Sequence, residues 1–142
     1  MLSMPTRSAE ELFQTPYHII DILPTRVLKD SPGQYFEVAE YFLQPAQMAA
    51  VKQRHINVVL KLNCYHDIRL DENGAINPDP QTIERIMRKR FVPIFIQDAL
   101  IVSEHDDTHM TIFNADDELL ELVGAIATSE GLFVWNPGQG AM

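Results

Sequence analysis

The stretch INVVLKLNCYHDIRL, residues 56–70, decides the fold that the sequence predicts. Its even-numbered positions, from Ile56 to Leu70, are apolar apart from His66, and its odd-numbered positions are mostly polar. A period of two places alternate side chains on opposite faces of a strand, whereas a helix would scatter both sets around its circumference. We therefore predict one long strand over 56–70, with Cys64 buried on its inward face.

The outward face of this predicted strand is a candidate recognition surface. Amide, phenol and charged groups on a rigid element suit the binding of a partner, although most such polar faces are simply solvated. The outward candidates are Asn57, Lys61, Asn63, Tyr65 and Asp67.

Capping and turn signals place the other elements. Apolar residues at 3.6-residue spacing predict a helix after Ser31-Pro32. Further helices are predicted over 45–54, after Asp79-Pro80 and after Asn114. Additional strands are predicted at 17–23, 99–104, 108–113 and 132–135, and the strands at 99–104 and 108–113 are predicted to form a hairpin.

The order of these elements predicts one α+β domain over 1–142, with 1–14 and 136–142 at its periphery. Because the elements do not alternate regularly, we expect a mixed sheet of about five strands with helices packed mainly on one face. The apolar run 91–96 has no clear period, and Pro93 argues against a central strand there. That run is predicted to be either core or a surface for self-association.

Charge is distributed unevenly along the chain. Residues 1–90 hold eleven acids and eleven Lys or Arg, whereas residues 91–142 hold nine acids and no Lys or Arg, which accounts for the net charge of −9. This balance disfavours binding to nucleic acid or to anionic lipid. It favours a basic protein partner. The acidic binding candidates are Asp106, Asp107, Asp116, Asp117, Glu118 and Glu121.

A second candidate site lies at the tip of the predicted hairpin, in HDDTH, residues 105–109. His105 and His109 could both bind a metal ion, but a tight hairpin does not bring positions i and i+4 onto one face as a helix does. No third ligand is fixed by spacing, so a solvated hairpin tip is the competing interpretation. We assign no catalytic residue and no cofactor.

The remaining sequence features indicate a cytoplasmic location. The first residues lack the apolar stretch of a secretion signal, and no run is long and apolar enough to span a bilayer. Cys64 is the only cysteine, so no internal disulfide can form.

Three functional hypotheses follow from the sequence. The first is a non-enzymatic binding protein, comparable to small inhibitor or immunity proteins, whose acidic third recognises a basic partner. The second is a small hydrolase-like enzyme that uses His105, His109, His66 or Asp67 around a metal or pocket. The third is a structural homo-oligomer assembled through 91–96.

Overall fold

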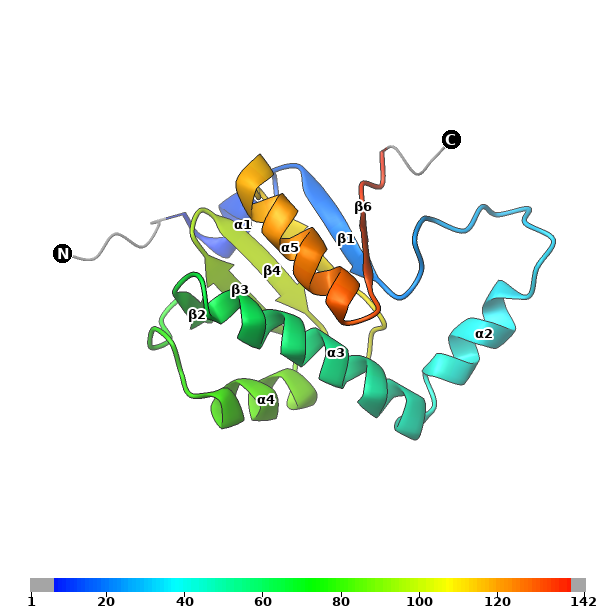
Figure 1. Cartoon of the computed structure of the whole chain (residues 1–142), viewed down its shortest axis with the longest axis horizontal. Coiled ribbons are helices and arrows are strands. Elements are labelled where there is room, and N and C mark those ends of the chain that lie inside the picture. The colour runs from blue at the N-terminus through cyan, green and yellow to red at the C-terminus, as the bar shows by residue number, and fades with distance from the viewer. Residues whose placement is uncertain (1–6, 139–142) are drawn as a thin grey trace.

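A six-stranded antiparallel sheet forms the centre of the molecule (Figure 1). The computed structural model describes residues 7–138, so parts of the segments 1–14 and 136–142 lie outside the described residues. The α+β class is confirmed, but the sheet has six strands and every pairing is antiparallel, so the prediction of a mixed sheet is wrong. In spatial order the strands are β2 (Ile68–Leu70), β3 (Val92–Ile96), β4 (Ala99–Ser103), β5 (Met110–Phe113), β1 (Tyr17–Asp21) and β6 (Phe133–Trp135).

Helices lie on both faces of this sheet, in unequal number. Three of them share one core cluster with alternate residues of the central strands, whereas a single short helix buries Leu12 against Phe95 and Leu100 on the opposite face. Leu12 is thus a core residue, within a segment that the sequence predicted to be peripheral. The helices are α1 (Ala9–Leu12), α2 (Tyr35–Phe42), α3 (Pro45–Asn63), α4 (Pro80–Lys89) and α5 (Asp117–Ser129). None of the helices in the described part of the chain combines the length and the apolar character that crossing a membrane requires.

The long strand predicted over 56–70 is wrong. Most of that stretch belongs to α3, which begins at Pro45 and continues to Asn63, and only its last three residues form β2. Asn77 fixes the change from helix to strand, because its side-chain oxygen accepts hydrogen bonds from the Asn63 side chain (2.8 Å) and from the Ile68 amide (3.0 Å). Cys64, predicted to be buried, is exposed at the helix end.

The neighbours of α3 explain the misleading period of two. This helix packs between α4 and α5 and also contacts the sheet, so it needs a wide apolar arc instead of a narrow stripe. When a helix has a wide apolar arc, more than half of its positions are apolar. Over a short stretch of sequence, such positions can alternate with polar ones as they do in a strand. The buried residues of α3 are Val51, Lys52, His55, Ile56, Val58, Val59 and Leu62, a set with helical spacing.

The segment 91–96 also departs from its prediction, since Val92–Ile96 is β3, an interior strand between β2 and β4. In an antiparallel strand the N–H and C=O positions of one residue point toward the same neighbour. The carbonyl of Pro93 accepts a hydrogen bond from Asp71, directly after β2 ends. The position where Pro93 lacks an N–H therefore faces the end of β2, a very short edge strand. The proline costs the sheet few backbone hydrogen bonds there.

Several local predictions are confirmed. The Asp79 carboxylate caps α4 by accepting from the Thr82 amide (2.8 Å), and β4 pairs with β5 as a hairpin. The helix predicted after Asn114 is capped instead by Asp116, whose carboxylate accepts from the Leu119 amide (2.8 Å).

Substitutions in α3 distinguish a helix from a strand at 56–70. Val59 is 1% exposed, so Val59→Ala is expected to lower the free energy of unfolding by about 2 kcal/mol through lost burial and a residual cavity. Cys64→Ala is expected to change it by less than about 0.5 kcal/mol because the thiol is exposed. Urea unfolding followed by circular dichroism measures both. A strand would give the reverse order, with Cys64 costly and Val59 neutral.

Candidate functional site

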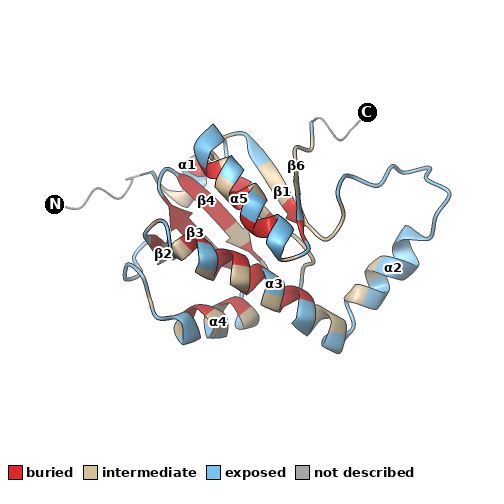
Figure 2. Ribbon diagram, viewed as in Figure 1, coloured by how far each residue is buried: buried red, intermediate tan, exposed pale blue. Residues whose placement is uncertain are grey.

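An apolar arm, defined here as residues 22–44, projects from the compact body. It consists of the connection after β1, helix α2 and the two residues that precede α3, and Figure 1 shows α2 apart from the sheet, beside the N-terminal end of α3, which it contacts. None of the residues of α2 is buried, and its ribbon is coloured only as exposed or intermediate in Figure 2. Seven large apolar side chains of the arm are exposed, namely Val27, Leu28, Tyr35, Phe36, Val38, Tyr41 and Leu43.

Two adjoining cavities lie where the arm meets the sheet. The inner cavity, of about 190 Å³, has the apolar residues of α2 as one wall and the β4–β5 turn, residues 104–109, as another. The outer cavity, of about 250 Å³, continues along the arm toward Arg26 and Trp135. Asp21 and His109 line both cavities.

The polar floor of the inner cavity is made by Asp21, Asp107 and His109. The His109 Nδ1 lies 2.9 Å from an Asp107 carboxylate oxygen, and this hydrogen bond, together with the charges of Asp107 and Asp21, raises the pKa of His109. Burial raises the pKa of Asp21.

Two buried side chains of α3 hold the β4–β5 turn in place. The Lys52 ammonium donates to the Glu104 carbonyl and to His55 Nδ1, the latter at 3.0 Å. Because His55 Nδ1 accepts this hydrogen bond, its Nε2 carries the proton and donates to the Thr108 carbonyl at 3.2 Å. One helical turn thus satisfies two carbonyls of the turn that carries Asp107.

The buried position of this pair controls its protonation. Desolvation lowers the pKa of Lys52 to about 8, against the opposing charges of Asp107, Asp106 and Glu104. Desolvation and the charge of Lys52 lower the pKa of His55 to about 3, so His55 is neutral at physiological pH.

The predicted acidic residues fall into two groups at opposite ends of the β4–β5 hairpin. Asp106 and Asp107 lie in the turn beside the arm, whereas Asp116, Asp117 and Glu118 begin α5 at the other end of the strands. A strand of five residues such as β4 spans about 17 Å, so the two groups are well separated. Glu121 is exposed farther along α5.

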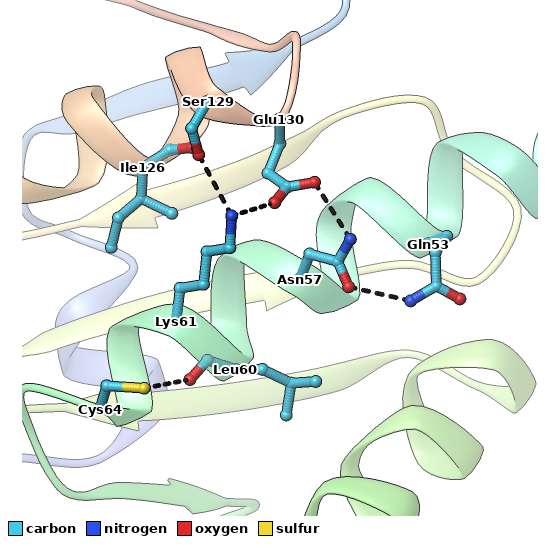
Figure 3. A network of polar contacts seen from close by, with 8 residues as sticks. All are labelled: Gln53, Asn57, Leu60, Lys61, Cys64, Ile126, Ser129 and Glu130. Carbon is cyan, nitrogen blue, oxygen red and sulfur yellow. Dashed lines mark hydrogen bonds and ion pairs between the residues drawn. The ribbon is translucent and has the colours of Figure 1, made fainter.

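The predicted outward row does not form a strand face. Asn57 and Lys61 lie on α3 and face the end of α5, where Asn57 donates to Glu130 (3.0 Å) and Lys61 forms an ion pair with the same carboxylate (2.6 Å), as Figure 3 shows. The Asn63 and Asp67 side chains are engaged by Asn77 in the connection that follows. The remaining member of the row, Tyr65, is 66% exposed beside the C-terminal end of α3.

The two histidines of the predicted metal site differ in their surroundings. Within the described residues, Glu104, His105 and Asp106 place three possible ligand atoms within 4.8 Å of one another, and His109 is not part of this group. His105 and Asp106 are exposed, whereas His109 is half-buried and paired with Asp107.

Sequence reasoning missed Asp21, Lys52, His55 and the exposed apolar residues of the arm. The burial of Lys52 and His55 has a signal in their spacing, since positions 52, 55, 56 and 59 share one helical face once a helix is extended beyond Arg54. The exposure of the arm has no such signal, because an amphipathic α2 predicts a buried apolar face.

His109 in the β4–β5 turn and His55, which bonds to that turn, are expected to titrate differently. His109 should titrate with a midpoint above 6.5, whereas His55 should stay neutral from pH 8 down to about pH 4. Nuclear magnetic resonance of the imidazole protons measures both, with assignments from His→Gln variants. Asp107→Asn should lower the midpoint of His109, and a midpoint near 6.5 for His55 would contradict its burial.

Comparisons of the chain with protein-family models, with curated proteins and with solved structures found no match. The arm, the two cavities and the β4–β5 turn are therefore the features that point to a function.

Proposed function

We propose that this chain is a non-enzymatic protein-binding module of the cytoplasm, and that the arm and the adjacent β4–β5 turn bind a basic partner protein. The observation that carries the proposal is the exposure of seven large apolar side chains on one projecting segment. Large apolar side chains that gather on an exposed segment are typical of interaction sites in soluble proteins.

The exposed side chains of α2 can supply binding free energy. Phe36 is 80% exposed and Tyr41 is 55% exposed, so both aromatic rings remain largely in water. Transfer of apolar surface from water is favourable by about 25 cal/mol per Å², and aromatic residues often dominate the binding energy of protein interfaces. A partner that covers α2 would recover this free energy, which the isolated chain does not.

Acidic residues lie beside these apolar side chains. Glu37 and Glu40 are exposed on α2, and Asp106 is exposed on the turn beside it. With a net charge of −9, the chain attracts a cationic protein over distances of about a Debye length and repels an acidic one. This combination, as in small acidic inhibitors, supports a partner with a basic rim around an apolar patch.

The segment 91–96 contributes little to this surface. Val92, Ile94, Phe95 and Ile96 are buried in the sheet, and Phe91 is the exposed member of the run. Self-association would therefore need a surface other than the buried residues of this run, and the arm offers exposed apolar residues for it.

Capture from an extract of the source cells tests the proposal. The double substitution Phe36→Ser and Tyr41→Ser should reduce recovery of a basic protein about tenfold or more, because it removes two exposed aromatic anchors. Its stability should stay within about 0.5 kcal/mol of the wild type, since α2 has no buried residue. High salt should release the captured protein.

Tyr65→Ser is the matched control. Tyr65 is also an exposed tyrosine, but it follows the C-terminal end of α3, whereas the arm precedes the N-terminal end. If only Tyr65→Ser abolishes capture, the binding site lies at the C-terminal end of α3 and not on the arm. A wild-type dimer in light scattering that the arm substitutions dissociate would identify a second copy of this chain as the occupant, against the proposal.

A further inference from the structure

The inner cavity has the composition of a small binding pocket. Tyr35, Val38 and Phe42 of α2 supply apolar lining, and Asp21 and Asp107 line the same cavity from β1 and the β4–β5 turn. Its volume of about 190 Å³ corresponds to about six water molecules at ~30 Å³ each. Apolar walls with a few convergent polar groups are typical of sites that orient a ligand.

Asp21 is the group in this pocket whose charge is least compensated. It is half-buried at the end of β1, and its carboxylate accepts a hydrogen bond from the Ile22 amide (2.7 Å). Among the described residues it forms no ion pair within 4 Å, whereas Asp107 is paired with His109.

The charged groups that line the inner cavity carry a net negative charge. His109 faces Asp107 and Asp21 from the turn, and Lys52 of α3 lies behind the turn, bound to backbone and to His55. Arg26 lines only the outer cavity, on the exposed connection after β1. Within the inner cavity, two carboxylates therefore face one imidazole.

We propose that the inner cavity binds an organic cation, with a guanidinium or ammonium head on a short apolar stem. The head would meet the carboxylates of Asp21 and Asp107, and the stem would lie along Tyr35, Val38 and Phe42 of α2. Charge-assisted hydrogen bonds to a carboxylate are about twice as strong as neutral ones, and a half-buried site screens them less than open solvent does. The cation is either a free small molecule or, if the proposed function holds, a Lys or Arg side chain of the basic partner.

His109 gives this site a characteristic pH dependence. Its imidazolium occupies Asp107 at a distance of 2.9 Å, so the proton on His109 and the cation of the ligand compete for the same carboxylate. Ionisation of Asp21, whose pKa is raised by burial, also requires higher pH. Both effects make cation binding tighter as pH rises.

Titration with n-butylguanidinium chloride, followed by backbone amide shifts in nuclear magnetic resonance, tests the site. Saturable shifts are expected at Asp21, Asp107, Thr108 and His109, with affinity about threefold or more tighter at pH 8 than at pH 6. The neutral isostere n-butylurea should not bind. Equal binding of n-butylurea, or shifts spread evenly over the acidic residues, would overturn the proposal.

Variants distinguish binding in the cavity from nonspecific attraction of the cation to the acidic protein. Asp21→Asn should weaken binding about tenfold, whereas Asp117→Asn, at the opposite end of the sheet, should leave it unchanged. His109→Gln should bind more tightly than the wild type at pH 6 because it removes the competing cation, and this gain cannot arise from misfolding. If His109→Gln binds no better at pH 6, or Asp21→Asn binds as the wild type does, the cavity is not a cation site.

The capture assay distinguishes the two sources of the cation. If n-butylguanidinium displaces the captured protein and Asp21→Asn reduces capture, the cation is a side chain of that protein. If capture is unaffected while the titration is saturable, the ligand is a free small cation. The titration needs no partner, so failure of the proposed function leaves its result intact, and failure of the titration overturns the cavity proposal whatever the capture shows.

Discussion

Helix α3 is enclosed by α4, α5 and the sheet, and this enclosure is the constraint on which the rest of the structure depends. A helix with neighbours on three sides must bury most of its circumference, including two polar residues, Lys52 and His55. Burial of these groups is tolerable only because each reaches a carbonyl of the β4–β5 turn. The packing demand on α3 therefore also fixes the backbone that presents Asp107 and His109.

The same enclosure sets the electrostatics of the site. Desolvation lowers the pKa of Lys52 and of His55. His109 directly follows Thr108, and the nearby carboxylates of Asp107 and Asp21 raise its pKa. Two histidines that contact the same turn thus have opposite shifts. Position relative to solvent and to Asp107, and not residue type, decides which of them carries a proton.

Local structure is predicted well from the sequence where interactions between residues close in the chain determine it. The Asp79 cap and the β4–β5 hairpin are examples, since the Asp-Pro signal and the short polar turn act locally. The sequence fails where tertiary neighbours decide. At 56–70 an apolar arc set by two flanking helices imitates strand alternation, and at Pro93 the shortness of β2 removes the objection to an interior proline. The candidate site was only half predicted: Asp107 and His109 stand out in one short motif, but Asp21 and Lys52 join them from distant positions through the sheet and α3.

The attachment of α2 has a consequence for how this protein can diverge. Thirteen residues connect β1 to α2, only two separate α2 from α3, and no side chain of α2 is needed by the core. Substitutions on its outer face are therefore nearly free of folding constraint, while its position beside the cavity stays anchored at one end. Related chains could therefore differ at the outward-facing residues of α2 and keep the same scaffold.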